Sequence, residues 1–364
     1  MKSAAPGVFD SPSNDSELNR YKLNGCESHS RELSRGDTDA SALAMDSEVA
    51  SAEVARVLPF STVDGPGNRM VFFLQGCNFR CPGCHNPETI TLCNACQECI
   101  AHCPAGALSL KSAAADTQAV PNSKASLRLA WDSTSCIGCD TCLDVCPSSS
   151  QPKTQRLSVG KALALIKRQK AFIRGITLSG GEASLQLKFV STLFKAIKQS
   201  PELKHLTCLL DTNGSLGASG WQRLLPWLDG AMVDLKAWDE PAHRRLTGRG
   251  NIKVKQSLQL LAEAGKLAEV RLLEVPGKSD YWQHFNALVS FLLDLQRRQA
   301  LKGEPMRLRL NGYNHHGVKG EALLWPKASQ QQIDDLAKAL SRAGIANISL
   351  PPVNLGDGLL KATE

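Results

Sequence analysis

Short apolar runs recur from residue 54 onward and alternate with longer segments whose apolar residues are three or four positions apart. The alternation of strands with helices predicts a parallel sheet wound by right-handed crossovers. We expect strands at Val71–Gly76, Gly175–Ser179, Leu206–Asp211, Ala231–Lys236, Val270–Val275 and Met306–Leu310, and helices at Ser158–Lys170, Leu185–Ile197, Ile252–Ala264, Tyr281–Leu295 and Gln331–Ala343. The sequence therefore predicts an α/β fold, a partial (β/α)6 barrel with its active site at the carboxyl ends of the strands.

Two regions depart from this pattern. Residues 1–50 are polar and aperiodic, and we expect a disordered extension in which Cys26 takes no part. An incorrect start is the alternative for this region, with Met45 as the true first residue. Residues 87–152 are dense in cysteine and predict a small domain inserted in a βα loop. The barrel would then comprise residues 51–86 and 153–364.

Composition narrows the class of protein. The 364 residues carry a net charge of +7 and include 13 cysteines. A chain of this size without an apparent secretory signal is not expected to be a disulfide scaffold. The absence of a long apolar run predicts no membrane span, and we expect a cytoplasmic protein. The basic charge suits an anionic partner or a solvated surface, and no basic run interleaved with aromatic residues indicates nucleic-acid binding.

The predicted insert contains the same cysteine pattern twice. Each copy has the spacing C-x2-C-x2-C-x3-C-P, with cysteines at Cys93, Cys96, Cys99 and Cys103, and again at Cys136, Cys139, Cys142 and Cys146. This spacing is typical of bacterial ferredoxins, in which the fourth cysteine of each run binds the other cluster. Zinc binding is the alternative. We therefore predict two [4Fe–4S] clusters in a ferredoxin-like domain.

A third cysteine group, Cys77-x3-Cys81-x2-Cys84, directly follows the first predicted strand. Three thiolates leave one iron of a [4Fe–4S] cluster without a protein ligand, and an open metal position is where substrate chemistry occurs. An accidental spacing or a zinc site is the alternative. Cys208 lies within an apolar strand and is predicted to be a buried core thiol.

Together with further motifs, these cysteines resemble the radical S-adenosylmethionine (SAM) superfamily. The similarity is greatest to the glycyl-radical-enzyme activases, the family of the pyruvate formate-lyase activating enzyme, and in detail to the YjjW type with a two-cluster ferredoxin insert. The supporting motifs are Asp64-Gly-Pro-Gly-Asn-Arg69, His85-Asn-Pro-Glu88, Ser179-Gly-Gly-Glu182, Asp211-Thr-Asn-Gly214, Asp234-Leu-Lys236, and Arg271 before Val275-Pro-Gly277. One departure is Gly83, where the family usually has an aromatic residue.

The resemblance implies roles for these motif residues. Ser179, Gly180, Gly181 and Glu182 would bind the amino group of SAM. Asp211, Thr212, Met232 and Asp234 would hold a monovalent cation, although two carboxylates could also act as general acid and base. Lys236 and Arg271 would pair with the SAM carboxylate or, alternatively, form structural salt bridges. His315 or His316 would lie near SAM, and a surface pair is the alternative.

The activity implied by the resemblance is reductive cleavage of SAM at a [4Fe–4S] cluster. The resulting 5′-deoxyadenosyl radical would take hydrogen from a backbone glycine of a partner glycyl-radical enzyme under anaerobic conditions. Cys77, Cys81 and Cys84 would carry the catalytic cluster, and the other two clusters would relay electrons from a flavodoxin or ferredoxin or have a structural role. Two other functions remain open, a radical SAM enzyme acting on a small molecule and an electron-transfer iron–sulfur protein.

Overall fold

The computed structural model describes residues 50–112 and 127–351, and the predicted extension therefore lies outside the described residues except for Ala50. A nine-stranded sheet in the order β11-β10-β9-β8-β7-β6-β2-β1-β5 forms its centre. The six predicted strands are all present in this sheet and pair in parallel. They are β2 (Arg69–Leu74), β6 (Gly175–Gly180), β7 (Thr207–Thr212), β8 (Gly230–Leu235), β9 (Leu267–Glu274) and β10 (Arg307–Gly312).

Three strands that the sequence did not predict extend the sheet at its edges. β1 (Ser51–Ser61) pairs antiparallel with β2 and with β5 (Gln155–Ser158). The two-residue β11 (Ile348–Ser349) pairs in parallel with β10. The described part of the chain is thus an α/β fold with a mostly parallel central sheet.

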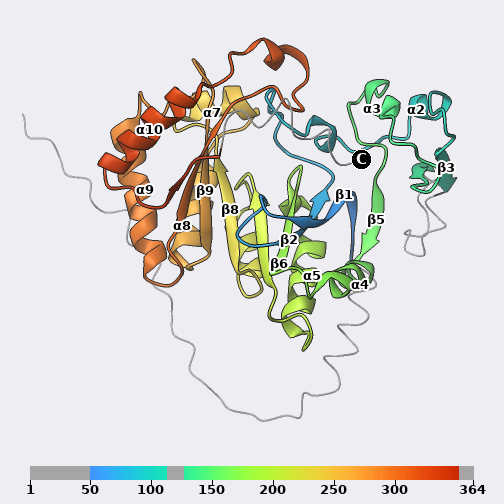
Figure 1. Cartoon of the computed structure of the whole chain (residues 1–364), viewed down its shortest axis with the longest axis horizontal. Coiled ribbons are helices and arrows are strands. Elements are labelled where there is room, and N and C mark those ends of the chain that lie inside the picture. Colours follow the sequence, from blue (N-terminus) through green and yellow to red (C-terminus); the bar gives the residue numbers. More distant parts are fainter. Residues whose placement is uncertain (1–49, 113–126, 352–364) are drawn as a thin grey trace, which may run out of the picture. The chain divides into compact units, whose positions relative to one another are not determined.

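Helices pack against the central sheet (Figure 1). The predicted helices are α4 (Val159–Gln169), α5 (Leu187–Gln199), α8 (Ile252–Glu263), α9 (Phe285–Ala300) and α10 (Gln330–Arg342); α6 (Ala218–Leu224) and α7 (Glu240–Thr247) are additional. Side chains alternate between the two faces of a strand. In β6, Ile176 and Leu178 enter the core with α5, whereas Ser179 faces the other way and lines a cavity.

Side-chain caps mark the first residues of two predicted helices. The Ser158 side chain accepts a hydrogen bond from Lys161 N at the start of α4, and Ser329 and Gln332 form a capping box at the start of α10. Such caps satisfy backbone N–H groups that have no partner within the helix.

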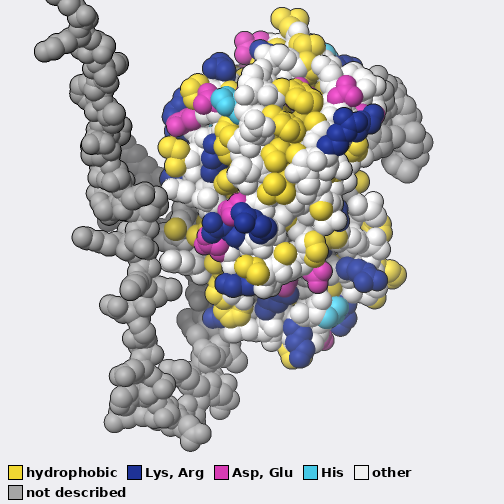
Figure 2. All heavy atoms as spheres, turned by 90° about the vertical axis from the view of Figure 1, so that its left-hand side faces the viewer, with side chains coloured by type: hydrophobic (Ala, Val, Ile, Leu, Met, Phe, Trp, Pro, Cys, Tyr) yellow, Lys and Arg dark blue, Asp and Glu magenta, His cyan; other side chains and the backbone are white. Residues whose placement is uncertain are grey.

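The face of the molecule with α9 and α10 shows hydrophobic side chains among lysines and arginines (Figure 2).

Arg69, the last residue of the Asp64–Arg69 motif, joins three strands at their amino ends. Its side chain is 1% exposed and donates to Thr177 Oγ1 at 2.7 Å, to the Ile176 carbonyl at 2.5 Å and to the Thr207 carbonyl at 2.9 Å. Burial lowers the pKa of this guanidinium to about 10. Residues at the amino ends of barrel strands commonly serve stability, and the contacts of Arg69 fit that role.

None of the helices in residues 50–112 and 127–351 combines the length and the apolar character that a membrane crossing requires.

Candidate active site

A cavity of about 490 Å³ lies at the carboxyl ends of the parallel strands. Most of the residues predicted for the active site line it: Cys77, Cys81, Cys84, Ser179, Gly180, Gly181, Asp211, Asp234, Lys236 and Arg271. Glu182, Thr212 and His315 do not line it. The cavity is also lined by residues that were not predicted from the sequence, among them Asn213, Arg309, Asn311, Tyr313 and Trp325. This volume is within the usual range for a small-molecule site.

The loop that carries the three cysteines is held by neighbouring loops and by the end of α7. Arg80 N donates to the Thr247 carbonyl at 2.8 Å, and Asn213 Nδ2 donates to Asn78 Oδ1 at 2.9 Å. The Phe79 ring meets the His243 ring edge-on, with centroids 5.7 Å apart. These contacts hold the loop against α7 and against the segment that follows β7, and a site for a metal cluster needs such support.

The three thiols are poorly solvated. Burial raises the pKa of Cys77 to about 11 and that of Cys81 to about 12, and it also raises the pKa of Cys84. Such thiols are protonated at neutral pH unless bound metal favours the thiolate. Phe79 N donates to Cys77 Sγ at 3.4 Å, and hydrogen bonds to ligand sulfurs are common around iron–sulfur clusters.

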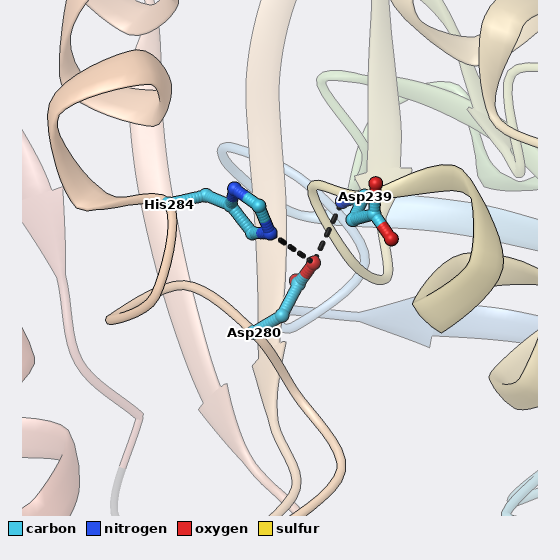
Figure 3. Close-up of side chains that lie close together, drawn as sticks. All are labelled: Asp239, Asp280 and His284. Carbon is cyan, nitrogen blue, oxygen red and sulfur yellow. Dashed lines mark hydrogen bonds and ion pairs between the residues drawn. The ribbon is translucent and has the colours of Figure 1, made fainter.

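In the described residues, one group of acidic and histidine side chains has ligand atoms within 4.8 Å of one another. It consists of Asp239, Asp280 and His284 (Figure 3). Asp280 uses both carboxylate oxygens to accept from Trp238 N and Asp239 N, each at 2.7 Å. Lys255 Nζ lies 3.7 Å from the centre of the Trp238 ring, where it adds positive charge. Asp280 thereby fixes the backbone at the start of α7, and His284 Nε2 lies 3.8 Å from Asp280 Oδ2.

Gly180 and Gly181 are required by the backbone of β2. A Cβ atom on Gly180 would lie 2.2 Å from the Leu74 carbonyl oxygen, and one on Gly181 would lie 2.4 Å from the Gly76 carbonyl oxygen. Gly180 also has a φ of +120°, which side chains disfavour. Because both glycines also line the cavity, they bring bare backbone to its wall next to the cysteine loop.

Two acidic and two basic side chains of the cavity form ion pairs with one another. Arg271 Nη1 lies 2.8 Å from Asp211 Oδ1, and Lys236 Nζ lies 3.0 Å from Asp234 Oδ2. Although burial alone would lower the pKa of Lys236, Asp234 and Cys81 raise it above its usual range. Met232 Sδ accepts from Arg271 Nη2 at 3.2 Å. Three of the four residues predicted to hold a cation therefore meet at Arg271 and Lys236, and the cation itself stays a prediction.

Glu182 turns away from the cavity and joins two loops. It is 1% exposed and accepts hydrogen bonds from Ser184 N at 3.0 Å, Thr212 Oγ1 at 2.8 Å and Asn213 N at 2.7 Å. These three bonds occupy both carboxylate oxygens and also explain the position of Thr212. The arrangement favours a structural role for Glu182 beside the site.

The segment that follows β10 presents Asn314 to the cavity in place of a histidine. His315 Nε2 is 2.9 Å from the Trp325 carbonyl oxygen, outside the lining, and His316 is exposed. His85, next to Cys84, does line the cavity, and its buried Nε2 has no hydrogen-bond partner among the described residues. Burial lowers the pKa of His85.

The two copies of the cysteine pattern share a backbone conformation as well as a spacing. In the first copy Ala95 and Gln97 have positive φ angles before α2 (Glu98–Ala101), and in the second Gly138 and Asp140 do so before α3 (Thr141–Asp144). The antiparallel strands β3 (Leu108–Ser112) and β4 (Leu127–Trp131) complete the segment. Figure 1 places α2, α3 and β3 together at one end of the sheet.

Cysteines from the two runs of this segment lie close to one another, and their ligation of clusters stays a prediction. Cys103, from the first run, lines a small cavity with the first three cysteines of the second run, Cys136, Cys139 and Cys142. Burial raises the pKa of Cys93, and the neighbouring Cys146 and Cys96 add to the rise. Ala107 N donates to Cys103 Sγ and Ser150 N to Cys146 Sγ, each at 3.3 Å.

Comparison with known proteins defines the class. The family model of the Radical SAM superfamily matches residues 71–292, and the chain belongs to this superfamily. This membership confirms the resemblance to the radical SAM superfamily, whereas the YjjW-type detail stays a prediction. Among its relatives is the isethionate sulfite-lyase activating enzyme of Desulfovibrio desulfuricans, 26% identical over 66% of this chain and 78% of that protein.

Two further relatives have similar names. The choline trimethylamine-lyase activating enzyme of Oleidesulfovibrio alaskensis is 28% identical over 75% of this chain and 87% of that protein. The pyruvate formate-lyase-activating enzyme of Streptococcus mutans is 28% identical over 72% of this chain and 80% of that protein. All three relatives are activating enzymes, although each is named for a different lyase.

Proposed function

We propose that this protein activates a glycyl-radical enzyme by radical SAM chemistry. The main observation in support is that Cys77, Cys81 and Cys84 line the same cavity as residues 179–181, at the carboxyl ends of the strands. Its relatives named as activating enzymes support the same function.

The chain's own residues supply binding, orientation and shielding. Cys77, Cys81 and Cys84 would hold a [4Fe–4S] cluster. The SAM carboxylate would bind Lys236 and Arg271 and replace the carboxylates that now pair with these two side chains. Ser179, Gly180 and Gly181 offer backbone groups at the cavity wall. When bound, the cluster and SAM supply a one-electron cleavage whose carbon radical removes hydrogen from the partner's glycine.

We assign the cysteine-rich segment to a ferredoxin-like domain with two further [4Fe–4S] clusters. One cluster would be held by Cys103, Cys136, Cys139 and Cys142, and the other by Cys93, Cys96, Cys99 and Cys146. The repeated N–H···S contacts and the crossed cysteines support this assignment. A flavodoxin or ferredoxin would be the electron donor, as the YjjW-type resemblance implies.

Exposed apolar residues near the cavity suit a protein substrate. Val63 is 66% exposed and lines the cavity, and Leu324, next to the lining residue Trp325, is 88% exposed. A partner loop that carries the glycine would bury them as it enters.

Cysteine replacements test the function in the anaerobically reconstituted protein. Three clusters correspond to about twelve iron atoms per chain. Cys81→Ala should abolish SAM cleavage with every reductant, whereas Cys139→Ala should retain cleavage with a small chemical reductant. Cys208→Ala is the matched control, because this buried thiol lies outside all three motifs and should keep full iron and activity.

The outcomes separate the alternatives. Full SAM cleavage by Cys81→Ala would overturn the assignment of the catalytic cluster. A wild-type protein that binds iron but never cleaves SAM would be an electron-transfer protein. SAM cleavage without any glycyl radical, measured by electron paramagnetic resonance on each candidate partner, would favour a small-molecule substrate.

A further inference from the structure

The cavity has a charged part and an apolar part. The charged part consists of Asp211 on β7, Asp234 on β8, Lys236 directly after β8 and Arg271 on β9. The apolar part lies at the end of β9 and after β10 and is lined by Leu273, Val275, Tyr313 and Trp325. SAM has the same division, with a charged amino-acid group at one end and an aromatic base at the other.

Trp325 forms a firmly supported wall of the apolar part. Its ring centre lies 5.7 Å from that of Tyr313, which is fully buried and donates from its hydroxyl to the Ala322 carbonyl at 2.6 Å. Lys278 Nζ lies 4.4 Å from the centre of the indole, and the ring also packs against Ala237 and Leu246.

Gly83 makes room for these two rings beside the third cysteine of the catalytic group. A Cβ atom at position 83 would lie 2.9 Å from Tyr313 Cε2 and 3.3 Å from Trp325 Cζ3. The space that a side chain at position 83 would occupy is therefore filled from a segment more than 200 residues further along the chain. An aromatic surface is present at this point of the cavity although position 83 itself provides none.

We propose that Trp325, supported by Tyr313, is the surface on which the adenine of SAM stacks. This inference rests on the proposed function, because it takes SAM as the ligand. Stacking of one base on an aromatic side chain contributes about 1–3 kcal/mol and requires no particular hydrogen-bond pattern. Trp325 would thereby position the base while Lys236 and Arg271 hold the other end of the molecule.

The test measures binding to the cluster-loaded protein by equilibrium dialysis, with SAM and with methionine as separate probes. Trp325→Ala should weaken SAM binding roughly 5- to 150-fold, the equivalent of one stacked base, and leave methionine binding unchanged. Trp325→Phe should recover most of the SAM affinity. Trp282→Ala is the matched control, because this tryptophan is 49% exposed, stacks on Phe285 and does not line the cavity.

Each other outcome overturns the inference. Unchanged SAM affinity in Trp325→Ala, with SAM cleavage intact, would show that the base binds elsewhere while the proposed function stands. Equal losses for SAM and methionine would show that Trp325 only supports the fold of the cavity. If the wild-type protein binds no SAM, the proposed function fails together with the inference.

Discussion

Replacing Glu182 with glutamine tests whether this carboxylate stabilises the fold or binds the ligand. The change keeps the shape of the side chain but puts an NH2 group where one oxygen now accepts hydrogen bonds. If the amide nitrogen takes the position of Oε2, it faces Asn213 N; if it takes that of Oε1, it faces Ser184 N. A donor meets a donor in either orientation.

The size of the effect follows from the burial of this group. A hydrogen bond to a charged acceptor contributes about 1.5–3 kcal/mol, and a buried donor left without a partner costs about 1–3 kcal/mol. We expect Glu182→Gln to lower the free energy of unfolding by about 2–4 kcal/mol. Thr212→Val removes one of the three donors and also the acceptor of Gly214 N, 3.1 Å away, and should cost about 2–3 kcal/mol.

Urea denaturation under anaerobic conditions, followed by circular dichroism, measures this change, and SAM dialysis is run in parallel. Glu202→Gln is the matched control, because Glu202 is a surface carboxylate paired with Lys167 and should leave stability nearly unchanged. The structural role would be refuted if Glu182→Gln kept its unfolding midpoint but lost SAM affinity. That result would place the carboxylate on the ligand, as the sequence resemblance implies.

Three shorter predictions use the same denaturation assay. Arg69→Gln should destabilise the protein by about 3 kcal/mol or more, since it removes buried hydrogen bonds that join three strands. Gly83→Ala should cost about 1–3 kcal/mol by overpacking against Tyr313, whereas Gly217→Ala, with open space around its Cβ, should cost a few tenths. Burial lowers the pKa of His243 below its ordinary value of 6.5, so on acidification the unfolded chain takes up the proton first. Stability should therefore fall as pH drops below about 6.5, by up to about 1.4 kcal/mol per pH unit, and His243→Gln should remove this part of the slope.

The sequence predicted the central strands because their pattern depends on local alternation and on length. β1 was missed although Ala52 and Val54 are buried in alternation, because Pro59 and the exposed Phe60 interrupt the apolar pattern. α7 was missed because its eight residues are mostly polar, although Pro241 in its first turn was a usable signal. In both elements the contacts that decide the structure come from neighbouring segments.

The candidate site shows the same limit. Motifs that each follow a parallel strand meet at one edge of the sheet, so their convergence could be predicted from topology alone. The orientation of Glu182, the choice of Asn314 over His315, and the filling of the space above Gly83 by Tyr313 and Trp325 depend on long-range packing. Arg309 could have been found, because it is two positions from Asn311 on the same strand face and pairs in register with Arg271.

The charge balance of the cavity suggests how a ligand such as SAM can enter it without leaving a buried charge unpaired. Three carboxylates, Asp64, Asp211 and Asp234, line the cavity with three basic side chains, Lys236, Arg271 and Arg309. An amino-acid group carries one charge of each sign, so it can exchange partners within the Asp211–Arg271 and Asp234–Lys236 pairs and leave the sum unchanged. The sulfonium of SAM remains as an excess positive charge. A cluster held by three thiolates is negative, and it would lie where Cys77, Cys81 and Cys84 line the same cavity. The attraction between the two charges, strengthened by burial, would favour binding of the sulfonium in the part of the cavity that these cysteines line.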